Sequence, residues 1–129
     1  MMRLPLAAVL ALSLTSGLAL SLTSGFAQAQ DAAAGQKAFA KCRTCHALEA
    51  GKNGVGPSLA GVFGRKSGTG AGFKYSDQMV AKGVIWDETS IAAYLADPKG
   101  YIPGNKMVFP GIKKESEVAD LIAFLKTAK

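Results

Sequence analysis

The segment that most constrains this chain is Cys42-Arg43-Thr44-Cys45-His46, a C-x-x-C-H sequence. It contains both cysteines and the single histidine of the 129 residues. In c-type haem attachment, the two thiols add across the haem vinyl groups and the adjacent histidine ligates the iron. Two intervening residues place both sulfurs along one porphyrin edge, and the next residue can fold under the iron. The motif therefore predicts one covalent haem c, attached through Cys42 and Cys45, with His46 as an axial ligand.

Three other kinds of site use the same cysteine spacing. A thioredoxin-type redox pair would precede a βαβ pattern, which this sequence does not show. A zinc site would need more cysteines or histidines than the chain has. A structural disulfide would leave His46 without a role. We therefore favour haem attachment and keep a thiol oxidoreductase as an alternative. An absorption spectrum of the purified protein distinguishes the two classes.

The N-terminus has the composition of an export signal. Arg3 is followed by an uncharged, largely apolar stretch over residues 4–22, and Ala27-Gln28-Ala29 matches the A-x-A cleavage pattern. We expect residues 1–29 to be a secretory signal peptide that is cleaved after Ala29, which places the mature chain in the periplasm. A duplicated octapeptide lengthens the apolar stretch, so a retained membrane anchor is the alternative.

Residues 30–129 are predicted to form one all-α domain. Hydrophobic periodicity indicates short helices over residues 32–40, 89–97 and 116–127. Two other stretches have no helical or strand period and are rich in glycine or proline, and they comprise residues 51–72 and 98–111. Long irregular segments in a small domain need something that orders them, and a large apolar cofactor would do so. The net charge of +6 is scattered rather than clustered, so no nucleic-acid partner is predicted.

The second axial ligand has few candidates. With a single histidine in the chain, the remaining donors of the mature sequence are Met79 and Met107. Met107 lies in the stretch bounded by proline and glycine, where the backbone can turn a side chain inward. Histidine–methionine ligation raises the reduction potential of a haem. It also closes both faces of the iron, which favours electron transfer over substrate binding.

The mature chain resembles the class I cytochrome c family, in particular the short bacterial cytochrome c2 type that is close to mitochondrial cytochrome c. The resemblance covers essentially all of residues 30–129 and rests on several motifs in order. Besides C-x-x-C-H, they are Gly35 and Phe39, Gly56-Pro57-Ser58-Leu59, Gly64-Arg65-Lys66-Ser67-Gly68, Gly72-Phe73-Lys74-Tyr75-Ser76, Trp86, Tyr94-Leu95-Ala96-Asp97-Pro98-Lys99, Tyr101-Ile102-Pro103-Gly104-Asn105-Lys106-Met107-Val108-Phe109 and Asp120-Leu121-Ile122-Ala123-Phe124-Leu125.

This resemblance implies the class I cytochrome c fold, in which short helices and glycine-rich loops wrap around one covalent haem. It implies that His46 and Met107 are the axial ligands and that the Pro57 carbonyl accepts a hydrogen bond from the His46 ring, which fixes the orientation of the ring. It also implies that Gly35 and Phe39 cross Leu121 and Phe124 where the terminal helices pack.

Further haem contacts are implied by the same resemblance. Arg65, Tyr75 and Trp86 are expected around a buried haem propionate, and Tyr94 beside the Met107 sulfur. The alternative is that the aromatic residues are ordinary members of the core. Two residues depart from the family pattern. Asn105 stands where the family often has threonine, and remains a cofactor-binding candidate that can donate a hydrogen bond. Met79 stands where mitochondrial-type proteins usually have asparagine.

The resemblance implies a soluble, monomeric electron carrier without enzymatic activity. Its expected donor is a cytochrome bc complex, and its acceptor a terminal oxidase or a photosynthetic reaction centre. Six lysines near the two haem-binding segments are predicted to attract acidic partners, namely Lys41, Lys52, Lys99, Lys106, Lys113 and Lys114. A peroxidase or a gas sensor is a rival class, but either would need an open sixth position on the iron, and a peroxidase would also need a distal acid–base residue.

Overall fold

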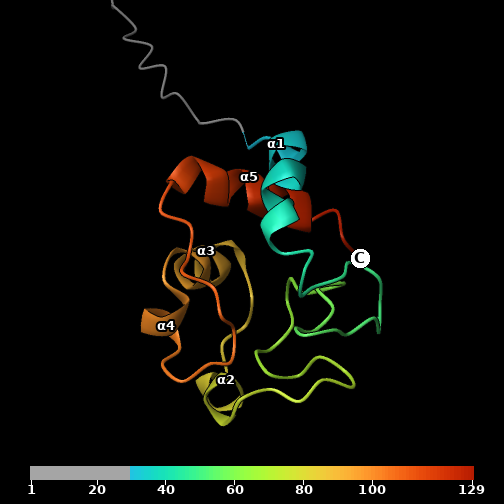
Figure 1. Ribbon diagram of the computed structural model, residues 1–129, viewed down its shortest axis with the longest axis vertical. Helices are drawn as coiled ribbons and strands as arrows, with labels where there is room; N and C mark the ends of the chain where they lie inside the picture. Colours follow the sequence, from blue (N-terminus) through green and yellow to red (C-terminus); the bar gives the residue numbers. More distant parts are fainter. Residues whose placement is uncertain (1–29) are drawn as a thin grey trace, which may run out of the picture.

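The computed structural model describes residues 30–129, so the predicted signal peptide over residues 1–29 lies outside the described part of the chain. The elements in order are α1 (Ala32–Ala38), the 3₁₀ helix η1 (Phe39–Lys41), α2 (Asp77–Lys82), α3 (Glu88–Ala96), α4 (Pro98–Tyr101) and α5 (Glu115–Leu125). Within these residues, β-pairing is limited to one isolated antiparallel bridge between Lys66 and Ile85. The all-α prediction is confirmed, and long loops connect the helices (Figure 1).

The three predicted helices are present with shifted ends. The segment predicted over residues 32–40 divides into α1 and η1. The helix predicted over residues 89–97 is α3, which begins at Glu88 because Asp87 and Ser90 form a reciprocal capping box. Its end before Pro98 agrees with the prediction, since proline disfavours a helical conformation in the preceding residue.

Two short helices lie where the sequence did not predict them. In α4, the Asp97 carboxylate accepts a hydrogen bond from the Gly100 amide at 3.0 Å, and Pro98 takes a first-turn position that needs no amide donor. In α2, the Ser76 hydroxyl accepts from the Met79 amide at 3.1 Å, and Gly83 ends the helix in the left-handed conformation at φ 61°. The prediction that residues 98–111 are irregular throughout was therefore wrong, because a local cap stabilises one turn of helix there.

The helices α1 and α5 cross at one end of the molecule (Figure 1). Gly35 permits this crossing, because a Cβ atom there would collide with the Asp120 carbonyl oxygen and lie 2.8 Å from Phe124 Cβ. The Phe39 and Phe124 rings pack with their centroids 5.4 Å apart. The predicted packing of the terminal helices is confirmed, and it holds together residues that are far apart in the sequence.

The core extends from this crossing toward α3. Its buried side chains include Phe39, Ile91, Leu121, Ile122 and Leu125, and Leu121 is fully inaccessible to solvent. Burying each such side chain contributes roughly 1.5–3 kcal/mol. Between η1 and α2 the chain forms only loops (Figure 1), and these loops contribute Val62 to the core.

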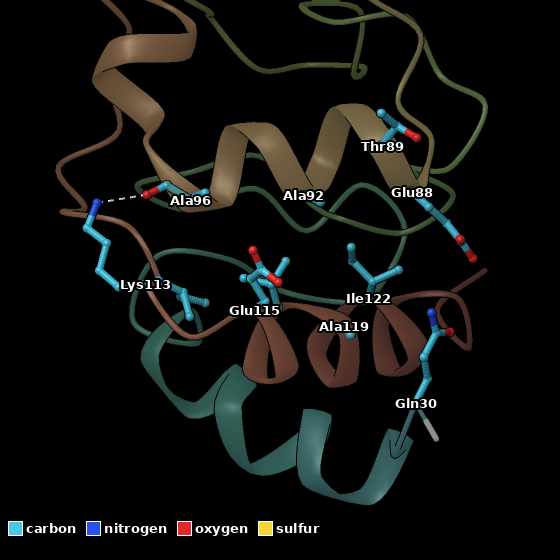
Figure 2. A pocket seen from close by; sticks show the side chains of 11 residues that line it. Gln30, Glu88, Thr89, Ala92, Ala96, Lys113, Glu115, Ala119 and Ile122 are labelled. Carbon is cyan, nitrogen blue, oxygen red and sulfur yellow. Dashed lines mark hydrogen bonds between the residues drawn. The ribbon is translucent and has the colours of Figure 1, made fainter. Parts of the chain in front are cut away.

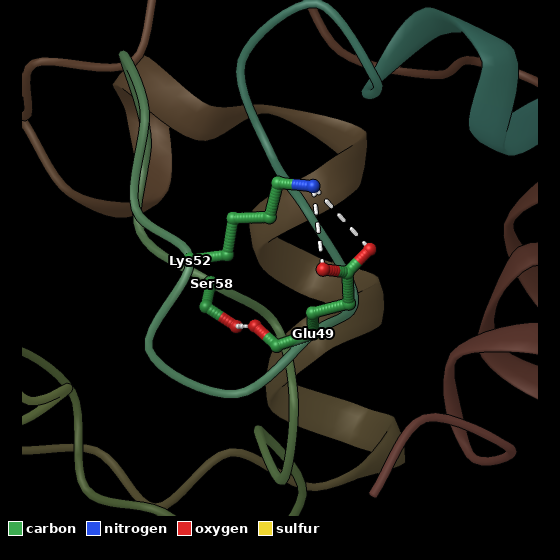
Figure 3. A network of polar contacts seen from close by, with 3 residues as sticks. All are labelled: Glu49, Lys52 and Ser58. Atoms are coloured by element: carbon green, nitrogen blue, oxygen red, sulfur yellow. Dashed lines mark hydrogen bonds and ion pairs between the residues drawn. The ribbon is translucent and has the colours of Figure 1, made fainter.

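Side-chain hydrogen bonds to the backbone order the long loop that follows His46. The Ser58 hydroxyl donates to the Glu49 carbonyl at 2.5 Å, and Lys52 pairs with the Glu49 carboxylate at 3.3 Å (Figure 3). The Asn53 carboxamide donates to the Ala71 carbonyl at 3.0 Å and accepts from the Ser58 amide at 2.9 Å. Side chains of the loop itself therefore contribute to its order.

Candidate haem site

The C-x-x-C-H motif forms a compact turn directly after η1. The Cys42 amide donates to the Phe39 carbonyl at 2.8 Å, and the His46 amide donates to the Cys42 carbonyl at 2.8 Å. Both cysteines are half-buried and neither is in a disulfide. Burial raises the pKa of the Cys42 thiol, and the neighbouring Lys41 charge opposes this effect. The turn thus presents two separate thiols and one imidazole within five consecutive residues.

The His46 ring is held between a carbonyl and a glycine. Its Nδ1 atom lies 2.8 Å from the Pro57 carbonyl oxygen. A Cβ atom on Gly56 would lie 2.5 Å from His46 Cε1, so only glycine permits this approach of the loop to the ring. Burial lowers the His46 pKa, and the Pro57 carbonyl opposes this effect. The ring is therefore neutral with Nδ1–H as donor, which leaves the Nε2 lone pair for a metal.

Met107 lies in the loop after α4, close to α3. Its sulfur is 3.8 Å from the Tyr94 hydroxyl, which also lies 3.3 Å from Asn105 Oδ1. Burial raises the Tyr94 pKa to about 12, so its hydroxyl is a neutral donor. Asn105 contacts the backbone on both sides of its own position, and it accepts from the Met107 amide at 2.8 Å. The structure thus brings Tyr94, Asn105 and Met107 together.

The three residues predicted around a propionate lie on neighbouring segments. Arg65 donates to the Ala60 and Ser58 carbonyls at 3.2 and 3.3 Å, and its carbonyl accepts from the Trp86 amide at 2.9 Å. The Tyr75 hydroxyl accepts from the Gly70 amide at 3.1 Å. The Trp86 ring lies against Tyr94, with centroids 5.3 Å apart. Trp86 and Tyr94 are members of the core, and their contacts with a haem stay a prediction.

Met79 is the other candidate for the second axial ligand. It lies in α2, half-buried against the core, and its amide is used by the Ser76 cap. The neighbouring Gln78 packs against Gly104, where a Cβ atom would lie 2.9 Å from Gln78 Cδ. The helix α2 therefore supports the loop that carries Met107.

All six lysines predicted to dock a partner are exposed, but four have partners within the chain. Lys41 forms an ion pair with Glu117, and Lys52 pairs with Glu49 at 3.3 Å. The Lys106 ammonium donates to the Lys74 carbonyl at 3.2 Å, and that of Lys113 to the Ala96 carbonyl at 2.9 Å. The other two, Lys99 and Lys114, are exposed and have no such contact within residues 30–129. The carboxylates beside Lys41 and Lys52 reduce the positive field of these two residues.

Sequence reasoning missed two exposed apolar side chains beside the ligand segments. Val108 follows Met107 and is 96% exposed, and Val55 precedes Gly56 and is 80% exposed. Their exposure depends on the loop conformation, so neither periodicity nor composition could have identified them. It also missed the role of Gly56 against the His46 ring, for which the only signal was a glycine directly before Pro57.

A groove of about 550 Å³ lies elsewhere, between α3 and α5 (Figure 2). It is lined by Ala92, Ala119 and Ile122, with Gln30 at one end and Lys113 at the other. None of the haem-attachment residues or candidate axial ligands lines it. This groove is therefore not the haem site.

The donor set fits an iron porphyrin better than a metal held by protein side chains alone. Within residues 30–129, no group of three or more His, Cys, Asp or Glu side chains is placed to bind a metal ion. The chain offers instead one oriented imidazole, two thiols at the attachment spacing and the half-buried thioether of Met107 beside the Tyr94 hydroxyl. Cys42 and Met107 both pack against the core cluster, so the same apolar surroundings contain a thiol for attachment and a candidate ligand.

Comparison with known proteins agrees with this donor set. The cytochrome c family model matches residues 32–129. Cytochrome c2 iso-2 from Magnetospirillum fulvum is 63% identical over 90 residues, which cover 70% of this chain and 94% of that protein. Cytochrome c2 from Blastochloris viridis is 52% identical over 99 residues, which cover 76% of this chain and 78% of that protein. The solved structure of cytochrome cH from Methylobacterium extorquens has a TM-score of 0.72 and 54% identity, and covers 75% and 98% of the two chains.

The chain belongs to the cytochrome c family, and the class I fold predicted from the sequence is confirmed. It is accordingly an electron-carrying haem protein, with haem c attached covalently, and Cys42 and Cys45 have the spacing that this attachment requires. No helix within residues 30–129 has the length and apolar character needed to cross a membrane.

Proposed function

We propose that this protein is a periplasmic carrier of single electrons whose haem iron is ligated by His46 and Met107. The observation that carries the proposal is the orientation of His46, with Nδ1 2.8 Å from the Pro57 carbonyl oxygen and the ring pressed against Gly56. Because Nδ1–H is donated to the Pro57 carbonyl, the Nε2 lone pair would be the one that binds the iron. When bound, the haem supplies the one-electron couple of its iron.

The protein residues set the properties of that couple. The Pro57 carbonyl makes His46 a stronger donor by accepting its Nδ1 proton. The Tyr94 hydroxyl, 3.8 Å from the Met107 sulfur, can donate to the thioether and modulate its donor strength. Cys42 and Cys45 hold the group covalently, so that it stays with the chain while the protein moves between partners. Arg65, Tyr75 and Trp86 would neutralise or hydrogen-bond a propionate.

An electron carrier fits these residues better than a haem enzyme does. Met107 lies in a loop held by several hydrogen bonds, which favours a closed sixth position over an open one. The sequence has one histidine, so no second histidine is present to serve as a distal acid–base group. The relatives named cytochrome c2 support the same class.

We infer that the carrier accepts electrons from a cytochrome bc complex and delivers them to a terminal oxidase or a photosynthetic reaction centre. The support is the set of exposed lysines on the segments around the two ligand loops, above all Lys99, Lys106 and Lys114. Exposed charge of one sign steers an oppositely charged partner and raises the association rate.

The proposal is tested by expressing the full chain with c-type maturation factors and isolating the exported protein. We expect a mature chain that begins at Gln30, a mass increased by one haem that survives acid–acetone extraction, and the weak near-infrared band of methionine–Fe(III) ligation in the oxidised protein. A mass without the haem increment would refute the attachment. An oxidised haem protein without that band would refute Met107 as the ligand.

A further inference from the structure

The Asn105 carboxamide makes more hydrogen bonds than any other side chain near Met107. Its Nδ2 donates to the Pro98 carbonyl at 2.9 Å and to the Ile102 carbonyl at 2.8 Å. Its Oδ1 accepts from the Met107 amide at 2.8 Å and lies 3.3 Å from the Tyr94 hydroxyl. Both donors of the amide are thus used within the protein, and its oxygen accepts from the Met107 amide with the Tyr94 hydroxyl also within reach.

These four contacts connect the Met107 backbone to two helices. Pro98 is the first residue of α4 and Ile102 is the residue at its C-terminal end, so the two Nδ2 bonds span that helix. Tyr94 belongs to α3 and is buried in the core. Asn105 therefore links the Met107 amide to helices whose positions are fixed by packing, although the loop itself has no regular structure.

We propose that Asn105 is a positioning residue that keeps Met107 on the iron by holding its loop against α4. The inference rests on the proposed ligation by Met107 and adds the group that controls how readily this ligand leaves. Because Nδ2 donates to two backbone carbonyls, the loop cannot swing outward without breaking both bonds. A side chain without these donors leaves the loop held by the bond from the Asn105 amide to the Ile102 carbonyl at 3.1 Å and by the Lys106 contact to the Lys74 carbonyl.

Asn53 supplies a matched control on the opposite ligand loop. It has the same side chain, donates to the Ala71 carbonyl at 3.0 Å and accepts from the Ser58 amide at 2.9 Å. Both residues are only partly exposed to solvent. Loss of either carboxamide removes backbone hydrogen bonds from an irregular loop, but only Asn105 contacts the Met107 loop.

The experiment measures the displacement of methionine from the ferric holoprotein by imidazole. At saturating imidazole, the observed rate equals the rate at which the methionine leaves. We expect Asn105→Ala to increase this limiting rate by about tenfold or more, since each lost hydrogen bond contributes on the order of a few-fold or more. Asn105→Asp keeps the shape and the acceptor contacts but removes both Nδ2 donors, and we expect it to increase the rate as well.

The control variant distinguishes the positioning of Met107 from a general loss of protein stability. Asn53→Ala should lower the denaturation midpoint of the holoprotein while leaving the limiting rate within about twofold of the wild type. Equal acceleration in the Asn53 and Asn105 variants would overturn the proposal, and so would a wild-type rate in Asn105→Asp. Suppose that the wild type shows the methionine band and that imidazole displaces the methionine no faster in Asn105→Ala than in the wild type. This inference then fails, while the proposed ligation by Met107 stands. Absence of the band from the wild type would refute both.

Discussion

The Pro57 carbonyl oxygen lies 2.8 Å from His46 Nδ1, and the adjacent Gly56 leaves no room for a side chain between the loop and the ring. This contact joins residues that are 11 positions apart, across the loop that the Asn53 and Ser58 hydrogen bonds hold together. The orientation of the candidate ligand thus depends on this contact, and a change at Gly56 should alter the reduction potential of the iron.

The first prediction concerns Gly56. In Gly56→Ala, the new Cβ atom would lie 2.5 Å from His46 Cε1, so the ring or the loop must shift and the bond to Pro57 weakens. A weaker bond makes the imidazole a poorer donor to Fe(III), and we expect the reduction potential to rise. Gly54→Ala is the control, because a Cβ atom there meets the Cys45 carbonyl at 3.3 Å and not the ring. Equal potentials for the two variants would contradict the role of Gly56.

The second prediction separates the two candidate methionines. Met107→Ala should abolish the near-infrared methionine band and lower the potential, because methionine ligation raises it. Met79→Leu should keep the band and the wild-type potential, since Met79 lies in α2 with its backbone amide in the Ser76 cap. Of the two methionines, only Met107 has the Tyr94 hydroxyl near its sulfur. The reverse pattern would assign the ligand to Met79. Absorption spectroscopy and redox titration of the oxidised holoproteins make both measurements.

The third prediction concerns docking. The electron-transfer rate with an acidic redox partner should fall as salt increases, since exposed charges are screened over roughly 10 Å at 0.1 M salt. Lys99→Glu and Lys106→Glu should slow the reaction more than Lys129→Glu at the C-terminus. Lys41→Glu should have a smaller effect than Lys99→Glu, because Glu117 already pairs with Lys41. A second-order rate that is indifferent to ionic strength would refute the electrostatic docking surface.

The fourth prediction concerns the crossing of α1 and α5. In Gly35→Ala, the methyl group would collide with the Asp120 backbone, and one helix must move to admit it. We expect a loss of about 1–3 kcal/mol in the free energy of unfolding, the usual effect of overpacking a core. The control is Gln36→Ala on the exposed side of α1, which should change stability little. Chemical denaturation of the holoproteins provides the comparison.

The fifth prediction is a pH dependence at the start of α3. Hydrogen bonds from the Ser90 amide and hydroxyl hold the Asp87 pKa below its usual value of 3.8. The stabilisation by this cap is therefore present above pH 3.8 and is lost as the pH falls through the lower pKa of the folded state. The difference in melting temperature between the wild type and Asp87→Ala should shrink over that range.

Ser90→Ala tests the cause of this pH dependence. It removes the hydroxyl that lies 3.0 Å from the Asp87 carboxylate, while the Ser90 amide bond at 2.8 Å remains. We expect a smaller pH dependence than in the wild type but a larger one than in Asp87→Ala. An unchanged profile would mean that the Ser90 hydroxyl does not lower the Asp87 pKa.

The sequence by itself determined what depends on residues close together in the chain. The C-x-x-C-H motif identified haem attachment because thiols and imidazole must lie within a few residues to reach one porphyrin. The apolar spacing of Val118, Leu121, Ile122 and Leu125 predicted α5 because helical periodicity is local. The family resemblance followed from the order of such local motifs.

Only the tertiary structure decided which distant residues meet. The four hydrogen bonds of Asn105, the pairing of Lys41 with Glu117 and the approach of Gly56 to the His46 ring depend on how the loops fold over one another. The short helices α2 and α4 also escaped prediction, because each is little more than one capped turn and carries too few residues to show a period. Irregular loops have no repeating pattern, so their contacts follow from packing against the rest of the chain.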